Sequence, residues 1–234
     1  MSHFEKTLKN PVWFALNETH QKLKINFNGV RFYHPDICTF GAFDDVSKTG
    51  EALNAYAKLT EKFFLVSEKS IPIFDPNTVV LNKKIEGCQM VLENLVDVEV
   101  TEAIVPLTEE YMDEIYNLIW LVMPGYYRRR TFEMGNYYGI FKAEKLVAIT
   151  GQRMQTNDFI ELSGVVTHPD YTRKGFAKQL VYYVTKEIIK ANKRVILHTT
   201  KGNTAIALYE SLGYKLTRDM NWWYFNRNDA TNEV

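Results

Sequence analysis

Apolar and polar positions alternate along several segments in the second half of the chain. The segment 98–107 (VEVTEAIVPL) has the two-residue period of a strand, and YYGIFK and LVAITGQRM are typical of a hairpin around Ala143-Glu144-Lys145. The segment 159–167 (FIELSGVVT) predicts a further strand, in which Gly164 indicates a bulge or a close backbone neighbour. The nearly continuous apolar run 194–200 (RVILHTT) is expected of a strand buried on both faces.

Helical spacing appears between these strands. Thr108 is expected to cap a helix whose apolar residues share one face and which ends at Pro124-Gly125. Apolar residues recur every four positions between Gly175 and Ala191, which predicts an amphipathic helix.

A short helix and a strand complete the pattern. Asn203 is expected to cap the helix, and Gly213 suits its left-handed end. The aromatic run 221–225 (NWWYF) predicts the last strand. The order strand, helix, meander, helix, strand, helix, strand predicts a mixed α/β fold.

The first hundred residues carry weaker patterns. Six of the seven prolines lie within residues 11–124, and the segment 71–77 (IPIFDPN) is typical of a loop. The patterns predict helices near 11–22 and 48–62 and strands at 30–33, 63–67 and 78–92.

The charge balance narrows the function classes. The chain of 234 residues has 28 basic and 28 acidic side chains, so its formal charge is zero. Apolar residues make up 46%, which excludes a disordered chain of low hydrophobicity and high net charge. Without a basic excess we expect no binding to nucleic acid.

Membrane and redox signals are weak. The longest apolar stretch, residues 115–123, is about half the ~20 residues that a membrane-spanning helix needs, and no apolar signal segment opens the sequence. We therefore expect no membrane association and a cytoplasmic protein, with Cys38 and Cys88 reduced. No metal site is expected, because ligand spacing is lacking.

Candidate chemistry is concentrated in residues 162–181, where a strand runs through a turn directly into a helix. The backbone N–H groups of the first helical turn, from Lys174 to Ala177, lack intrahelical partners, and the helix dipole adds positive potential there. A phosphate suits such a site, and Gly175 allows close backbone approach. The alternative is a plain surface helix with solvated lysines.

Three windows together resemble one family. Thr172-Arg173-Lys174-Gly175-Phe176-Ala177 resembles the Q/R-x-x-G-x-G/A helix start of the GCN5-related N-acetyltransferases (GNAT). Residues 124–141, 161–181 and 197–216 are similar to the FR47-like branch, which includes glycine N-acyltransferase-type proteins. The resemblance covers about 98–234, and Thr172 departs from the usual Gln or Arg.

The resemblance implies a domain organisation. Residues 98–234 are expected to form the GNAT N-acetyltransferase domain. Residues 1–97 resemble the smaller, degenerate GNAT-like domain that lacks cofactor in such two-part proteins, and we expect that part to be non-catalytic.

The resemblance also implies acetyl-CoA as cosubstrate, bound in a V between the strands 159–167 and 194–200. The pantetheine arm would pair with the strand backbone. The cofactor contacts implied are Val165, Val166, Thr167, Arg173, Lys174, Gly175, Phe176, Ala177, Lys178, Asn203 and Tyr209. For Asn203, a simple helix-capping role is an alternative that does not exclude this contact.

Acyl transfer to an amine requires two proton movements. An amine with a pKa near ~10 must lose a proton before it attacks a thioester. Glu161 matches the general base of the family, with Glu133 as the reserve, and Tyr209 matches its general acid. The backbone amide of Val165 or Val166 is expected to hold the oxyanion.

Other polar and aromatic residues are assigned structural roles first. His168 and His198 are expected to be satisfied structural histidines. Arg128-Arg129-Arg130 is expected to be a solvated run, and contact with the 3′-phosphate or an acidic acceptor is the alternative. Four tyrosines could form walls of an acceptor pocket: Tyr126, Tyr127, Tyr137 and Tyr138.

The sequence thus predicts an N-acetyltransferase that acts directly on a primary amine of a small molecule or peptide. Neither cysteine lies in the motif segments, so no covalent enzyme intermediate is expected. The alternative is a catalytically inactive acyl-CoA-binding sensor or scaffold. The acceptor remains open among amino acids, polyamines, antibiotics, peptide N-termini and lysine side chains, and a homodimer is compatible with the aromatic content.

Overall fold

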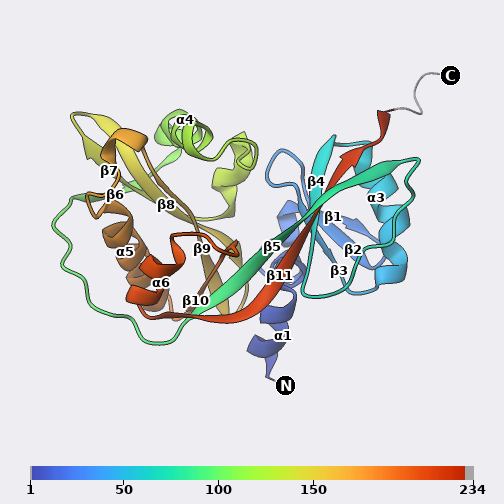
Figure 1. Cartoon of the computed structure of the whole chain (residues 1–234), viewed down its shortest axis with the longest axis horizontal. Coiled ribbons are helices and arrows are strands. Elements are labelled where there is room, and N and C mark those ends of the chain that lie inside the picture. Colours follow the sequence, from blue (N-terminus) through green and yellow to red (C-terminus); the bar gives the residue numbers. More distant parts are fainter. Residues whose placement is uncertain (1, 230–234) are drawn as a thin grey trace.

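A single curved sheet runs through the whole molecule. The computed structural model describes residues 2–229, in which 11 strands have the order β1-β2-β3-β4-β11-β5-β10-β9-β8-β7-β6 (Figure 1). The strands are β1 Lys24–Phe27, β2 Val30–Tyr33, β3 Phe40–Phe43, β4 Lys62–Ser67, β5 Val79–Leu92, β6 Ile104–Leu107, β7 Tyr137–Lys142, β8 Lys145–Gln155, β9 Phe159–Thr167, β10 Arg194–Thr200 and β11 Tyr214–Arg227.

Helices cover both faces of this sheet, which confirms the mixed α/β fold. The α-helices are α1 His3–Lys9, α2 Pro11–Asn17, α3 Thr49–Ala57, α4 Met112–Val122, α5 Phe176–Lys190 and α6 Ile206–Ser211. Short 3-10 turns lie at η1 Gln21–Leu23, η2 Val46–Lys48, η3 Glu109–Tyr111, η4 Arg129–Met134 and η5 Pro169–Tyr171. None of the helices within residues 2–229 has the length and apolar character needed to cross a membrane.

The meander β7-β8-β9 has one helix on each face. α5 buries Phe176, Leu180 and Val184 in a cluster that includes strand residues such as Leu162. α4 packs on the other face, where its apolar side chains join a separate cluster with β8 and β9. Apolar side chains on both faces of these strands explain why the sequence pattern is so clear here.

β9 and β10 pair for only part of their length. They are parallel and in register from Phe159 opposite Arg194 to Leu162 opposite Leu197, and no further pairs follow. In β9 the register against β8 shifts next to Gly164, whose φ is +65°. This is the bulge that the sequence predicted at Gly164, and it turns the end of β9 away from β10.

A long two-stranded ribbon joins the two halves of the molecule. β5 and β11, each of 14 residues, pair antiparallel along most of their length. β11 also pairs with β4, and β5 with β10, so strands from both predicted domains alternate in one sheet. The sheet therefore continues across the predicted domain boundary at residues 97 and 98. The division into two domains stays a prediction.

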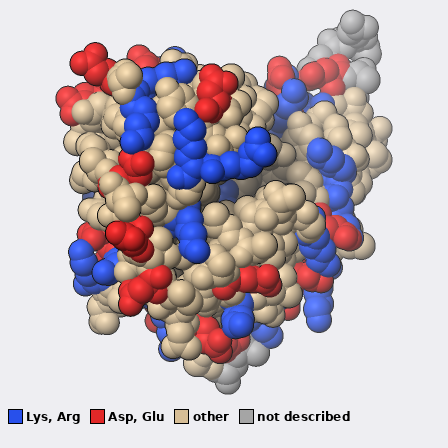
Figure 2. Space-filling view, turned by 60° about the vertical axis from the view of Figure 1, so that its left-hand side comes forward, with Lys and Arg blue, Asp and Glu red and all other residues tan. Residues whose placement is uncertain are grey.

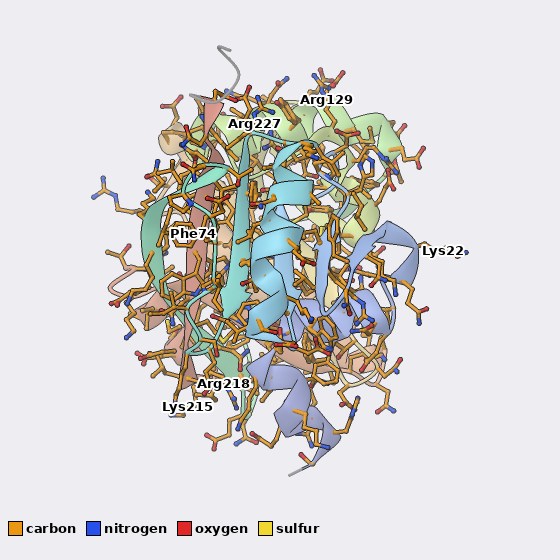
Figure 3. All side chains as sticks on the ribbon, turned by 90° about the vertical axis from the view of Figure 1, so that its right-hand side faces the viewer. Lys22, Phe74, Arg129, Lys215, Arg218 and Arg227 are labelled. Carbon is orange, nitrogen blue, oxygen red and sulfur yellow. The ribbon has the colours of Figure 1, made fainter. Side chains whose placement is uncertain are left out.

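The N-terminal part has two apolar layers. α3 lies across its outer face (Figure 3), where Leu53 and Tyr56 pack with Phe32 and Phe225. α1 and α2 pack on the other face, in a cluster that also contains Phe159 and Ile196 of the C-terminal strands. This shared cluster fixes the N-terminal part against the ends of β9 and β10.

Several sequence expectations are corrected. The predicted strand 98–107 is a regular strand only from Ile104. In the segment before it, the backbone amides of Thr101 and Glu102 donate to the side-chain oxygen of Gln179 and not to a neighbouring strand. The hydroxyl of Thr108 donates to the Glu110 carboxylate and does not cap a backbone amide.

Helix ends are corrected in the same way. α2 ends at Asn17 and α3 at Ala57, both earlier than predicted, and α1, β1 and β3 were not predicted. α6 begins at Ile206, while Asn203 accepts a hydrogen bond from the Ala205 amide just before it.

The turn between β7 and β8 is formed by residues that rarely adopt its backbone conformation. Ala143 and Glu144 are the two loop residues, with φ of +46° and +63°. Such left-handed pairs suit the right-handed twist of hairpin strands but favour Gly, Asn or Asp. Glu144 is exposed, so its side chain contributes little packing there.

We predict that Glu144→Gly stabilises the protein by about 1 kcal/mol, because glycine adopts a positive φ without the penalty of a Cβ. Urea unfolding followed by circular dichroism measures this change. Glu144→Ala is the matched control, since it removes the side chain but keeps the Cβ. Equal stabilities of the two variants would contradict the prediction.

Candidate active site

A cavity of about 580 Å³ opens where β9 and β10 part. Ser163, Gly164 and Val165 line it from β9, and Thr199 and Thr200 line it from β10. Along this stretch, the edges of β9 and β10 that face each other have no strand partner within the described residues. The exposed backbone groups on this edge of β9 can therefore pair with an extended ligand.

Four of the predicted cofactor contacts line this cavity. They are Val165, Ala177, Asn203 and Tyr209. The side chain of Val166 points to the opposite side and packs against α4, so this residue can offer only its backbone to the cavity. Thr167 pairs with Ala148 of β8.

Tyr209 reaches the same cavity from α6. Its side chain packs in the α5 cluster, lines the cavity and is 7% exposed. Burial raises the pKa of Tyr209 to about 12. The phenol therefore keeps its proton at neutral pH and can donate it to a charge that develops in the cavity.

The start of α5 presents free backbone amides. Among the described residues, the N–H groups of residues 173–178 have no hydrogen-bond acceptor, and we call this segment the amide nest. Arg173 has a φ of +59° and Gly175 a φ of +78°. Left-handed residues that alternate with ordinary ones turn successive N–H groups toward one point, which suits an anion.

Two basic side chains accompany the amide nest. Arg173 and Lys174 are exposed, and the Lys174 ammonium lies 4.9 Å from the ring centre of Tyr171. Phe176 is buried in the core, so it offers the nest only its amide. Thr172 donates its hydroxyl to the carbonyl oxygen of Pro169 and is thereby used within the loop.

Glu161 lies beneath the cavity in a saturated cluster. Its carboxylate is fully buried and accepts from Nε and Nη2 of Arg153 at 2.8 and 2.6 Å. Nδ1 of His198 lies 2.7 Å from Oε1, and the amide of Met154 donates to Oε2 at 3.3 Å. Four donors thus occupy the lone-pair positions of this carboxylate.

The cluster keeps Glu161 ionised. Burial alone would raise its pKa, but the charge and hydrogen bonds of Arg153, together with His198, outweigh burial and lower the pKa to about 2. A carboxylate with so low a pKa binds protons weakly. Its predicted role as general base is untested, and its contacts show a carboxylate that holds Arg153 and His198 in place.

His198 lies between Glu161 and Gln89. Its Nε2 is 3.0 Å from Nε2 of Gln89, and the same Gln89 nitrogen also donates to the carbonyl of Leu8. Gln89 is therefore the donor, so Nε2 of His198 accepts and Nδ1 carries the hydrogen toward Glu161. His198 lines the cavity, so it is both a structural residue, as expected, and part of the candidate site.

Other candidates from the sequence lie apart. Glu133, the reserve base, is an exposed residue in a bidentate pair with Arg130. Of the four tyrosines considered as pocket walls, only Tyr126 lines the cavity among the described residues. Tyr127, Tyr137 and Tyr138 are buried in the core.

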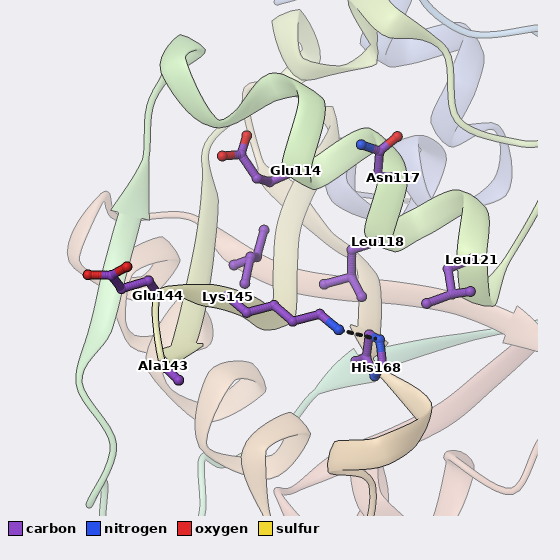
Figure 4. Close-up of a pocket in the computed structure, with 9 residues that line it drawn as sticks. Glu114, Asn117, Leu118, Leu121, Ala143, Glu144, Lys145 and His168 are labelled. Carbon is purple, nitrogen blue, oxygen red and sulfur yellow. Dashed lines mark hydrogen bonds between the residues drawn. The ribbon is translucent and has the colours of Figure 1, made fainter.

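A second cavity, of about 480 Å³, lies between α4 and the β7–β8 turn (Figure 4). Leu118 and Leu121 point into it from α4, and Nζ of Lys145 lies 2.9 Å from Nε2 of His168. None of the residues that line it belongs to the parted ends of β9 and β10 or to the amide nest. We therefore assign the chemistry to the first cavity.

The residues that the sequence analysis missed come from distant segments. Arg153, Phe40, Phe64 and Trp222 all line the first cavity. Arg153 was detectable as a charged residue in the interior of a largely buried strand, and such a residue is usually paired or functional. Phe40, Phe64 and Trp222 carry no local signal, because each also fits an ordinary core strand.

The charge distribution supports a site for anions. Lys and Arg side chains gather around a hollow between the two halves of the molecule (Figure 2). No cluster of three His, Cys, Asp or Glu side chains within residues 2–229 is placed to hold a metal ion.

Comparison with known proteins finds a family model that matches part of the chain. Residues 137–223, which include the hairpin, the bulged strand, the nest and α6, match the model of the FR47-like protein family. Over these residues the chain is similar to the FR47-like branch of the GNAT family. No curated protein matches its sequence.

Solved structures show a likeness over almost the whole chain. A protein from Novosphingobium aromaticivorans, described as an acetyltransferase of the GNAT family, superposes with a TM-score of 0.83 at 26% identity, over 94% of this chain and 98% of its own. A GCN5-related N-acetyltransferase from Kribbella flavida has a TM-score of 0.59 at 13% identity, over 93% and 96% of the two chains. The latter likeness concerns the fold alone.

The buried cluster around Glu161 makes the acid dependence of stability testable. Below pH 4.5 the unfolded chain protonates Glu161 while the folded chain, with a pKa of about 2, does not. Stability from this group is therefore complete above pH 4.5 and is lost as the pH falls toward 2, by about 3 kcal/mol. Urea unfolding between pH 6 and 3 should show about 2 kcal/mol of this loss in the wild type.

Glu161→Gln should lack that part of the acid dependence and should be less stable by about 3–5 kcal/mol at pH 7, since Arg153 loses its buried partner. The control is Glu133→Gln, the same change in an exposed bidentate pair, which should cost less than about 1 kcal/mol. Similar losses in both variants would contradict the buried-cluster account.

Proposed function

We propose that this chain transfers an acyl group, with acetyl-CoA as the donor, directly to a primary amine. The observation that carries the proposal is the cavity at the parting of β9 and β10, with Tyr209 on its wall and the amide nest at the end of β9. The family resemblance supports the reaction class.

The nest would hold the diphosphate of the cosubstrate. Six free N–H groups at residues 173–178 and the N-terminal end of the α5 dipole favour a negative charge there. Arg173 and Lys174 add positive side chains at the same place. The pantetheine arm would then run along β9 and pair with its backbone at Val165 to Thr167, as an added strand.

The chemical step would join the amine nitrogen to the thioester carbon and break the carbon–sulfur bond. One ammonium proton leaves before attack, and the backbone amide of Val165 or Val166 would hold the oxyanion. The departing thiolate takes the Tyr209 proton, and the second amine proton then returns to the phenolate.

The first proton would leave through water in the cavity, because the lone pair of His198 Nε2 already accepts from Gln89 and donors occupy Glu161. Glu161 would act as a positioning residue that fixes the His198 ring through Nδ1. This assignment gives the predicted base an indirect role, since donors fill its own lone-pair positions.

One feature favours the alternative of an inactive acyl-CoA-binding module. Thr172 stands where the family usually has Gln or Arg, and its hydroxyl is used by Pro169 within the loop. The nest therefore lacks one side-chain contact to phosphate. Binding of acetyl-CoA without release of free thiol for any primary amine would favour this module.

We predict that Tyr209→Phe lowers kcat by at least about 100-fold, because the thiolate loses its proton donor. Release of CoA thiol, measured with an amine panel, gives the rate. Calorimetry should give an unchanged Kd for acetyl-CoA. Tyr111→Phe, outside the cavity, is the matched control and should keep wild-type activity; a full rate in Tyr209→Phe would exclude the proposed acid.

We also predict that Gly175→Ala weakens acetyl-CoA binding about fivefold or more. A Cβ at this residue meets nothing closer than 3.9 Å, so the change acts through the φ of +78° and distorts the nest by about 1 kcal/mol. Calorimetry compares it with Gly29→Ala, which has a φ of +70° in a turn outside the cavity lining. Wild-type affinity in Gly175→Ala would contradict binding at the nest.

A further inference from the structure

Arg153 uses only part of its hydrogen-bonding capacity. Nε and Nη2 donate to the buried Glu161 carboxylate, whereas Nη1 has no acceptor among the described residues. The side chain is 20% exposed, and the residue lines the cavity. Because the Nε and Nη2 edge faces a fully buried partner, the exposed part of the guanidinium is the part that a ligand can reach.

The cavity offers no negative charge to a second cation. Its described lining contains Arg153 and no Asp or Glu. Glu161 lies outside the lining and is already shared between Arg153, His198 and the Met154 amide. A polycationic acceptor would enter without a carboxylate partner, and this is costly away from water.

A second arginine adds to this imbalance. Arg128 is half-buried and lies near Tyr224, which stacks on Phe64 with ring centres 4.7 Å apart. The described residues include no ion-pair partner for Arg128. Arg128 does not line the cavity, so its charge acts on the Phe64 wall only through Tyr224, in the same direction as the charge of Arg153.

The remaining wall is apolar and aromatic. Phe40 and Phe64 contact edge to face at 5.5 Å, and Phe64 lies 5.8 Å from Tyr126. Trp222 contacts the His198 ring at 5.7 Å. The guanidinium carbon of Arg153 lies 5.0 Å from the Phe40 ring centre, so charge and aromatic surface meet at one place.

We infer that the acceptor is an amine that also carries a carboxylate and an apolar, preferably aromatic, body. The carboxylate would accept from Nη1 of Arg153, and the body would lie against Phe40, Phe64 and Trp222. The amine is then directed toward His198 and the parting of the strands. This inference rests on the proposed function, and it excludes polyamines and other polycations as preferred acceptors.

The first test compares acceptors with the full-length wild-type chain and acetyl-CoA. L-Phenylalanine, phenethylamine, glycine and spermidine are assayed for thiol release. Phenethylamine lacks only the carboxylate, and glycine lacks only the aromatic body. We expect kcat/KM for L-phenylalanine to exceed those of the other three by at least about tenfold, since a charge-assisted bond is worth roughly 1.5–3 kcal/mol. An equal or higher value for phenethylamine or spermidine overturns the inference and leaves the proposed function intact.

The second test does not need turnover. In the presence of CoA, calorimetry measures the binding of 3-phenylpropanoate, which has the carboxylate and the aromatic body but no amine. Arg153→Lys keeps a positive charge beside Glu161 but removes the Nη1 donors, and it should weaken this binding at least tenfold. Arg130→Lys, on the exposed surface, is the matched control and should bind as the wild type does.

The outcomes separate the two proposals. If 3-phenylpropanoate binds to the wild type and not to Arg153→Lys while no amine is acetylated, the anion site stands and the proposed transfer fails. If 3-phenylpropanoate does not bind, or binds equally to Arg153→Lys, the inference fails. Retained affinity of Arg153→Lys for CoA shows that the variant is folded.

Discussion

The candidate site depends on the point at which β9 leaves β10. The two strands are held together up to the Leu162–Leu197 pair, and the bulge at Gly164 then turns β9 outward. A residue with a Cβ would be strained at the left-handed φ of this glycine, so the parting is built into the chain. The opened strand edge, the approach to α5 and the position of Tyr209 all follow from this single departure from regular pairing.

Beneath the parting, one buried carboxylate organises the polar floor. Glu161 is held by β8 through Arg153 and by β10 through His198, so it ties together the two strands on either side of β9. A buried ion pair contributes little net stability compared with apolar packing, but loss of one partner is costly. Such a cluster is better explained by the geometry that it imposes on the cavity than by its contribution to folding.

The elements of the C-terminal part could be predicted because each has a local signal, either an amphipathic period or, for β10, a continuous apolar run. β9 and β10 have the predicted bounds, and α5 differs by one residue at each end, since local periodicity reflects the sheet and core around them. β3 was missed because its four residues are all buried and show no alternation. Thr108 and Asn203 fitted capping patterns, yet their side chains satisfy other groups, which only the fold determines.

Only part of the candidate site could be predicted from the sequence. The nest and Tyr209 lie in contiguous motifs, so a single sequence is enough to suggest them. The aromatic wall of the first cavity brings together Phe40, Phe64 and Trp222. Their proximity depends on strand order rather than on sequence spacing. Glu161 was found by position, but its low pKa depends on Arg153 and His198, which reach it across neighbouring strands.

The shared ribbon of β5 and β11 has a consequence for motion. Because β11 is hydrogen-bonded to β4 on one side and to β5 on the other, the two halves of the molecule share a continuous sheet within the described residues. Any rotation of one half would break a continuous ladder of backbone bonds. In the proposed transfer, substrate entry and product release would depend on small shifts of surface segments such as Met123–Tyr126, while the sheet fixes the spacing between the aromatic wall and the parted strands.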